Sequence, residues 1–258
     1  MSRLKPIAVL LCAAAVLSSC DAFEDNAVQE ITGPMPTSRV KFFNFGVGAP
    51  GVNFYANDTK MTAISSTSGT ESTNGVNYGN AGANGMYVAI DPGQYTFSGR
   101  IAAATDKDLP ISSVSAAIET RKYYSFYQSG IYDGTAKTVD AFVIEDVMPT
   151  GTIDFSVAHV RFVNAISNGT GDLNLFADNA QTTDPEIPIG GAVAYKGAGA
   201  FVTVPQGIYN LRAAYTGGAN VVTRNTVSFV GGRVYTIASR GNTATATTLG
   251  LDNTQNQQ

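Results

Sequence analysis

Few side chains in this sequence could carry out acid–base or nucleophilic catalysis. His159 is the one histidine, and it opens an alternating segment in which it shares a predicted face with Arg161. A catalytic base needs a nucleophile within hydrogen-bond reach and a third group that orients it, and the sequence has no Gly-x-Ser-x-Gly nucleophile motif. We therefore interpret His159 as a basic residue exposed at the end of a strand.

The carboxylates could act as an acid–base pair, as they do in glycoside hydrolysis. The candidates are scattered over predicted strand ends and turns, namely Asp91, Asp106, Asp108, Asp133, Asp140, Glu145 and Asp146. Oxygen ligands for calcium occur in residues 106–108 and around Asp172, between Asn168 and Asn174, but neither group has the spacing of a calcium-binding loop. We expect no enzyme activity, no metal and no cofactor.

One group of side chains could bind a ligand without catalysis. Tyr124 and Phe126 are predicted to face inward on their strand, so that Tyr123 and Tyr127 face outward, and Tyr132 follows in the next turn. Exposed aromatic side chains can form a stacking surface for sugars or for another protein. Tyr123, Tyr127 and Tyr132 are therefore the candidate ligand-binding residues. The alternative is that a neighbouring domain covers this face of the strand.

The elements that must position these residues occur twice. Four sequence blocks of the first half return in the same order in the second half, and they are 39–44 and 159–164, 52–56 and 173–177, 92–97 and 205–211, and 122–126 and 233–237. We infer two copies of one domain, at 38–148 and 157–253. A linker at 149–156 joins them, and a polar tail at 254–258 follows.

Each block alternates apolar and polar residues, as in Arg39-Val40-Lys41-Phe42, which is typical of a half-buried β-strand. A copy of roughly 100 residues with about seven such strands suits a two-sheet sandwich. The predicted fold class is all-β, with two tandem antiparallel β-sandwich domains of an immunoglobulin- or transthyretin-like kind; a barrel is the alternative. The Ser/Thr/Gly/Asn-rich stretch at 60–84 is predicted to be a surface loop or a weak edge hairpin, and a binding loop is the functional alternative.

The first twenty residues indicate export. Arg3 and Lys5 precede an apolar run at 7–17, which is the layout of a signal peptide. The run is about half of the roughly 20 residues that cross a bilayer. Leu17-Ser18-Ser19-Cys20 resembles the lipobox of bacterial lipoproteins, which implies removal of residues 1–19 and a lipid on Cys20. An ordinary signal peptide with a chance cysteine is the alternative. Residues 20–37 would then form a flexible tether of roughly 20–25 Å.

Composition limits the chemistry of such a mature chain. Cys12 leaves with the signal peptide and Cys20 is lipidated, so that no thiol remains for a disulfide or for a zinc site. Loss of Arg3 and Lys5 reduces Lys+Arg from 16 to 14 against 20 Asp+Glu, which gives a net charge of −6. An acidic chain gains nothing from phosphate neutralisation, and we expect no nucleic-acid partner.

The repeated blocks resemble the bacterial family called domain of unknown function 4397. The likeness is carried by Val160-Arg161-Phe162-Val163-Asn164, Leu173-Asn174-Leu175-Phe176, Pro92-Gly93-Gln94-Tyr95 and Tyr235-Thr236. The family's usual Asp in the second strand is Asn53 and Asn174 in this chain. The resemblance implies an extracytoplasmic β-sandwich that is often lipid-anchored, and it implies no activity.

The acidic residues that follow Cys20 bear on the cellular location of the protein. Asp21, Glu24 and Asp25 resemble the export signal of surface lipoproteins in Bacteroidetes-type bacteria, which implies the outer membrane, facing outward. An Asp after the cysteine instead resembles an inner-membrane retention signal in enterobacterial lipoproteins, and acids also simply solvate a linker.

We therefore expect a non-enzymatic, lipid-anchored lipoprotein of the cell envelope that acts as a structural, adhesion or interaction module. Its expected partners are the membrane, through Cys20, and an extracellular glycan or an envelope protein. The alternative function is a glycan-binding accessory protein that uses the exposed tyrosines of the first copy.

Overall fold

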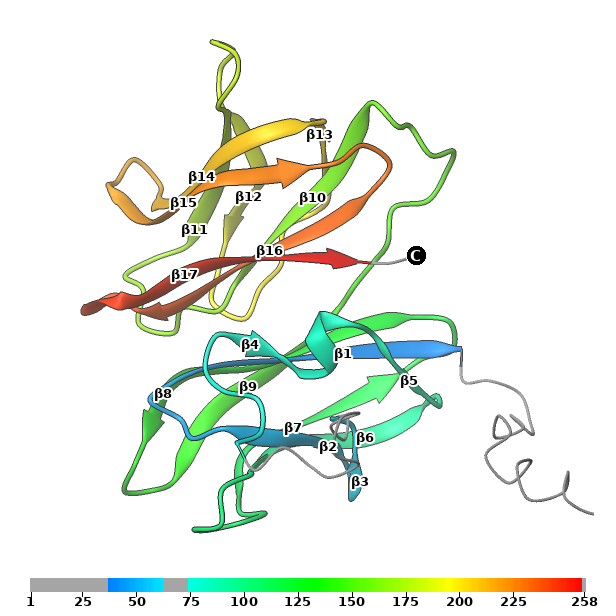
Figure 1. The fold of residues 1–258 in the computed structure, drawn as a ribbon, viewed down its shortest axis with the longest axis vertical. Coiled ribbons are helices and arrows are strands. Elements are labelled where there is room, and N and C mark those ends of the chain that lie inside the picture. The colour runs from blue at the N-terminus through cyan, green and yellow to red at the C-terminus, as the bar shows by residue number, and fades with distance from the viewer. Residues whose placement is uncertain (1–36, 63–73, 257–258) are drawn as a thin grey trace, which may run out of the picture. The chain divides into compact units, whose positions relative to one another are not determined.

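The computed structural model describes residues 37–62 and 74–256 (Figure 1). The predicted signal peptide, Cys20 and the tether up to residue 36 lie outside the described residues, as do positions 63–73 of the Ser/Thr-rich stretch and positions 257–258. The described residues belong to one compact unit, Pro36–Gln258. No helix within the described ranges is long and apolar enough to cross a membrane.

The first half folds into two sheets. One has the strand order β4-β1-β8-β9, with β5 also paired to β1, and the other has the order β3-β2-β6-β7. The elements are β1 (Ser38–Val47), β2 (Val52–Ala56), β3 (Thr59–Lys60), β4 (Asn80–Ala81), the 3₁₀ turn η1 (Gly82–Gly85), β5 (Val88–Ile90), β6 (Gly93–Ile101), β7 (Pro110–Ile118), β8 (Tyr123–Asp133) and β9 (Thr138–Glu145). Within the stretch predicted as a loop or weak hairpin, β4 is a short edge strand on β1.

The second half repeats this topology, with the orders β13-β10-β16-β17 and β12-β11-β14-β15. Its strands are β10 (Val157–Asn164), β11 (Leu173–Asn179), β12 (Ile187–Val193), β13 (Val202–Pro205), β14 (Gly207–Tyr215), β15 (Asn220–Phe229), β16 (Val234–Asn242) and β17 (Thr245–Asn256). The duplication predicted from the sequence blocks is confirmed, because the blocks fall on equivalent strands. Each half is sandwich-like, with two sheets.

Each sandwich has its own core between its two sheets. In the first, Phe42, Phe54, Phe97 and Phe126 contact one another, with ring centroids 5.3–6.1 Å apart. The second core is mainly aliphatic, with Leu173, Leu175 and Ile237 fully buried among others. The alternation seen in the sequence therefore places the inward side chains correctly.

The prediction of purely antiparallel sheets is wrong at one position in each half. β1 pairs with β8 in parallel, with Arg39 opposite Tyr123, and β10 pairs with β16 in parallel, with His159 opposite Val234. Parallel strands need a long crossover connection. The chain provides one in each half, because it builds the opposite sheet between the two parallel strands.

The outer face of the β1 sheet is buried as well. The alternating pattern predicts that Lys41 points to solvent, yet its exposed fraction is 1%. The reason is that β1 and β8 lie against β16 of the second sandwich, so that the outer faces of two sheets cover each other. The alternating pattern of the sequence therefore predicts the burial of the inner face of this sheet but not the burial of its outer face.

The prediction of a polar tail at 254–258 is also wrong for residues 254–256. β17 continues to Asn256, which lies opposite Val234 at the start of β16, and the Asn256 side chain is buried. Polar residues suit this strand end because a buried cation from the first sandwich needs their oxygen atoms as hydrogen-bond acceptors. The second sandwich thus extends beyond the predicted end at residue 253.

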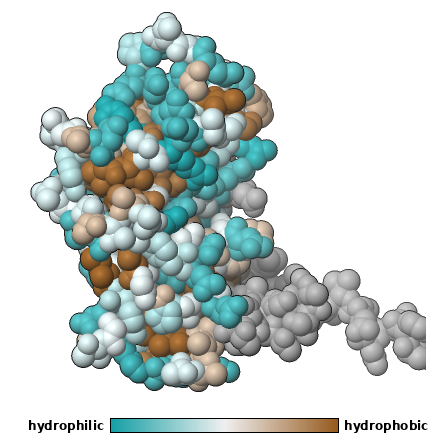
Figure 2. All heavy atoms as spheres, turned by 60° about the vertical axis from the view of Figure 1, so that its left-hand side comes forward, coloured by the Kyte–Doolittle hydropathy of each residue, from teal (hydrophilic) through white to brown (hydrophobic). Residues whose placement is uncertain are grey.

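Figure 2 shows the surface with the left-hand side of Figure 1 turned forward. Hydrophobic side chains there form separate groups on both sandwiches, divided by hydrophilic surface. Ile131, near the end of β8, is a large hydrophobic residue with an exposed fraction of 48%.

Candidate functional site

The contact between the two sandwiches has an apolar centre. It is formed by Phe43, Phe45, Tyr127 and Phe142 of the first sandwich and by Val163, Ala165 and Ala238 of the second. The Tyr127 ring stacks on Phe43 at 4.7 Å and on Phe142 at 5.0 Å between centroids. Tyr127 is fully buried, and its hydroxyl has no hydrogen-bond partner. Its role is packing between the two halves of the unit.

A buried ion pair lies beside this apolar centre. Arg161 on β10 pairs with Asp146, which follows β9, and both side chains are almost completely buried. The Arg161 guanidinium also donates to the Glu145 carbonyl oxygen at 3.2 Å and to the Thr236 hydroxyl at 3.0 Å. Asp146 further accepts from Ser125 at 2.8 Å. A buried pair of charges is tolerated only when its remaining hydrogen-bonding groups are satisfied in this way.

A second buried cation completes the polar contact. The Lys41 ammonium donates to the Gln255 carbonyl oxygen at 2.8 Å and to the Asn256 Oδ1 atom at 3.0 Å, and Asn256 donates to the Thr236 hydroxyl at 2.9 Å. The Tyr87 ring lies 4.2 Å from the Lys41 ammonium, and its hydroxyl donates to Asp146 at 2.6 Å. Lys41, Asn256, Thr236, Arg161, Asp146 and Tyr87 thus form a closed ring, which we call the polar lock.

The two sides of the polar lock are equivalent. Lys41 and Arg161 occupy the same position on β1 and β10, and each binds the end of the last strand of the other sandwich. Asn256 lies opposite Val234, and the Asp146 amide donates to the carbonyl oxygen of Tyr123, the equivalent of Val234 in the first sandwich, so that Asp146 is the counterpart of Asn256. Reciprocal contacts of this kind are the mark of a twofold-related interface. The duplicated domain therefore packs against its own copy as two subunits of a dimer would.

Burial sets the charge state of the polar lock. The loss of hydration lowers the pKa of Lys41 from 10.5 to about 8, and the nearby Asp146 carboxylate opposes this shift. Burial raises the pKa of the Tyr87 hydroxyl, and the Asp146 charge raises it further. The lock thus holds two cations and one anion, so that Lys41 is the group whose charge is least compensated.

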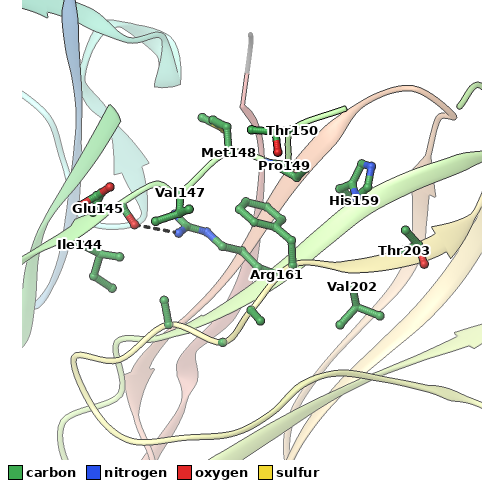
Figure 3. Close-up of a pocket in the computed structure, with 14 residues that line it drawn as sticks. Ile144, Glu145, Val147, Met148, Pro149, Thr150, His159, Arg161, Val202 and Thr203 are labelled. Carbon is green, nitrogen blue, oxygen red and sulfur yellow. Dashed lines mark hydrogen bonds between the residues drawn. The ribbon is translucent and has the colours of Figure 1, made fainter. Parts of the chain in front are cut away.

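An open groove borders the polar lock on one side (Figure 3). Its volume is about 960 Å³, and it runs between Ile144 near the end of β9, the segment 147–150 that leads into the linker, and the segment 198–203. The Phe201 ring lies 5.0 Å from the Arg161 guanidinium at its base. Each guanidinium nitrogen of Arg161 already donates a hydrogen bond, and the side chain is almost completely buried, so this cation is not free to bind a ligand in the groove.

His159 lines the same groove at the start of β10 (Figure 3). The sequence interpretation places His159 at a strand end and exposed to solvent. Its position at the start of β10 agrees with this, but its side chain is half-buried. The groove brings it near Arg161, Thr203 and Thr150, and the described lining contains no serine or cysteine.

The three candidate tyrosines do not form one exposed surface. Tyr127 is buried between the sandwiches, so the prediction that it faces solvent is wrong, and the alternative of an inter-domain contact describes it correctly. Tyr132 is half-buried against the inner core of the first sandwich. Tyr123 is half-buried beside Tyr87, with ring centroids 5.1 Å apart. The neighbouring copy covers the outer face on which the ligand surface was expected.

Several of the scattered carboxylates have local partners. Asp106 pairs with Lys137 at 2.6 Å, and Asp108 accepts from the Tyr55 hydroxyl at 3.2 Å. Asn174 donates to Thr216 at 3.0 Å. In the part of the chain that the structure describes, no three His, Cys, Asp or Glu residues gather as metal ligands would. Of the acids considered, Asp146 alone lies in the polar lock.

The repeated motif residues form the same internal hydrogen bonds in both copies. Tyr95 donates to the Asp91 carbonyl oxygen at 3.0 Å, and its counterpart Tyr209 donates to the Pro205 carbonyl oxygen at 2.8 Å. A second pair of tyrosines accepts from backbone amides at 3.1 Å, namely Tyr124 from Glu119 and Tyr235 from Val230. These hydrogen bonds join the strand ends to neighbouring loops in both copies.

Sequence reasoning missed Lys41, Arg161 and Asp146 as a group. The signal was present, because Lys41 and Arg161 stand at the same place in the two blocks, next to the outward-facing aromatic and aliphatic residues Phe43 and Val163. A charged residue in a row of apolar ones on an outer face indicates a covered face.

Two solved structures are similar to this chain at low identity. The Bacillus anthracis TIE protein is 9% identical with a TM-score of 0.24, and the match covers 79% of this chain and 33% of that one, so that this chain spans about a third of its length. The tip fimbrial protein Mfa3 from Porphyromonas gingivalis, with a C-terminal truncation, is 11% identical with a TM-score of 0.25, and the match covers 86% of this chain and 99% of that one.

No curated protein matches the chain. The family described as domain of unknown function (DUF4397) matches twice, at residues 38–168 and 158–258. These two matches correspond to the two sandwiches and include the strands that form the polar lock. The chain therefore belongs to the DUF4397 family and carries two tandem domains of it.

Proposed function

We propose that this protein is a non-enzymatic, lipid-anchored component of the cell envelope, facing outward from the outer membrane, that acts as a structural, adhesion or interaction module. The observation that carries the proposal is that charged side chains lie buried in the contact between the two sandwiches. Arg161 and Asp146 form a buried ion pair between the sandwiches, and the buried Lys41 of the first sandwich donates to Asn256 of the second. The two domains are thereby joined into a single body that can present a surface.

The anchor is tested by metabolic labelling with a fatty acid. The wild-type chain is expected to take up label, and Cys20→Ala is expected to take up none, because the thioether that carries the lipid forms at that sulfur. Cys12→Ala is the matched control and should label like the wild type. Equal labelling of Cys20→Ala and the wild type contradicts the anchor.

The surface location is tested separately by treating intact cells with protease. Residues 37–256 should be digested if they face the medium and protected if they face the periplasm. Protection from protease together with normal labelling would leave the anchor in place and refute the surface location.

A further inference from the structure

Four large apolar side chains are exposed at one end of the second sandwich. They are Ile153, Phe155, Ile208 and Val230, with exposed fractions of 54%, 74%, 38% and 45%. We call them the linker-end patch. Single exposed apolar residues are ordinary, but a group of them marks an interaction surface.

The linker half of the patch packs on a glycine turn. Phe155 and Ile153 pack closely over Gly232. A Cβ atom placed on Gly232 would lie 2.8 Å from a ring carbon of Phe155 and 3.1 Å from a methyl carbon of Ile153. The Gly232 amide donates to the Val157 carbonyl oxygen at 2.8 Å. The linker residues are therefore held against the turn between β15 and β16.

The strand half of the patch lies at the same end. Val230 directly follows β15, and Ile208 stands opposite Ser228 in the β14–β15 ladder. The Gln206 amide donates to the Ser156 carbonyl oxygen at 3.0 Å, which joins the start of β14 to the linker. Three loops thus bring the four apolar side chains to one end of the sandwich.

The chain enters the described structure on the same side of the molecule as the linker (Figure 1). The Arg39 amide at the start of β1 donates to the Lys122 carbonyl oxygen at 3.0 Å, and the Asp146 amide donates to the Tyr123 carbonyl oxygen at 2.7 Å. The start of β1, the start of β8 and Asp146, which follows β9, therefore lie together. Figure 1 shows the beginning of β1 and the linker on the same, right-hand side.

We propose that the linker-end patch rests on the surface of a lipid bilayer, with Phe155 and Ile153 in contact with the acyl chains near the headgroups. The inference rests on the proposed function, because a lipid on Cys20 would bring this end to the membrane. Cys20 precedes Thr37 by 17 residues, which limits the distance between them to at most about 60 Å. A tether this short keeps the patch at high effective concentration near the bilayer.

The chemistry of the patch favours lipid contact through apolar groups. The charged neighbours Asp154 and Arg233 are both exposed and opposite in sign, so they give the patch little net attraction to charged headgroups. Side chains of this kind bury to a depth of roughly 5–10 Å at the headgroup boundary. The contact should therefore persist at high salt, where electrostatic binding is screened.

The test uses tryptophan as a depth probe, because the chain contains no tryptophan. Phe155→Trp places it in the patch, and Ile131→Trp places it at the exposed end of β8. Each is combined with Cys12→Ser in the full chain, so that Cys20 is the one thiol and can be coupled to a maleimide lipid in phosphatidylcholine vesicles. Lipids brominated near the headgroup end of the acyl chains serve as quenchers.

We expect the emission of Phe155→Trp to fall by about half in brominated vesicles, at low and high salt alike, while Ile131→Trp stays nearly unquenched. Equal quenching of both variants, or none in Phe155→Trp, overturns the inference; self-association of the unquenched chain would then assign the patch to a second copy. Because the coupling replaces natural lipidation, failure of this inference is distinguishable from failure of the Cys20 labelling experiment.

Discussion

At the scale of single residues, the buried Lys41 gives the protein a specific pH dependence. Its pKa is about 8 in the folded chain and 10.5 when unfolded. Between these values the unfolded chain binds a proton that the folded chain does not, so the free energy of unfolding contributed by Lys41 rises as the pH rises. Below pH 8 this contribution stays at its minimum. Over the full window the rise is at most on the order of 3 kcal/mol.

Lys41→Met should remove this rise. We expect the stability of the wild type to increase relative to that of Lys41→Met between pH 8 and pH 10.5, as measured by urea unfolding followed by circular dichroism at several pH values. Lys107→Met, which removes an exposed lysine of the loop between β6 and β7, is the control. If Lys41→Met and Lys107→Met have parallel pH profiles, Lys41 does not carry the effect.

At the scale of the elements, the end of β17 belongs to the polar lock. A chain that stops at Asn253 loses the Gln255 carbonyl and the Asn256 amide, the two acceptors of the buried Lys41 ammonium. Hydrogen bonds to a charged group contribute about 1.5–3 kcal/mol each, and a buried charge left without them is costly. We expect the free energy of unfolding to fall by about 3 kcal/mol or more.

The matched control for this truncation is a chain that stops at Asn256. It keeps every pairing of β17 with β16 that the structure describes, and it should unfold at the same urea concentration as the full chain. Similar stability of the two truncated chains would mean that the last three residues of β17 do not hold the lock.

The elements also show how far the sequence could predict this fold. The alternation of Val40 and Phe42 with their polar neighbours identifies β1 and its inner face, because one buried face is enough to produce a period of two. It cannot identify what the outer face meets. Lys41 and Tyr127 are compatible with solvent and with a covering sheet alike, and the difference lies in the arrangement of the two sandwiches. For the same reason the partners within the polar lock could not be predicted, although the equivalent positions of Lys41 and Arg161 beside Phe43 and Val163 do indicate a covered face.

At the scale of the whole molecule, the two copies have different side chains at equivalent positions of their contact, and these side chains are complementary to each other. Tyr127 and Ala238 occupy equivalent positions, opposite Phe43 on β1 and Val163 on β10. Both lie in the apolar centre of the contact, where a large ring on one copy faces a small side chain on the other. Likewise, Asp146 in one copy is Asn256 in the other, which leaves one anion between two cations. Two identical copies would bring two rings together at this site.

This complementarity predicts that one substitution should separate the two halves. Ala238→Glu places a carboxylate among apolar side chains, which costs several kcal/mol, yet Ala238 belongs to neither inner core. The wild type should lose hydrogen-exchange protection in β2 and β11 at one urea concentration, as a cooperative unit does. Ala238→Glu should lose it at two. Ala192→Glu, at an exposed position of β12, should behave like the wild type. A single transition in Ala238→Glu would show that the sandwiches stay coupled without the apolar centre, which would leave the polar lock as the connection between them.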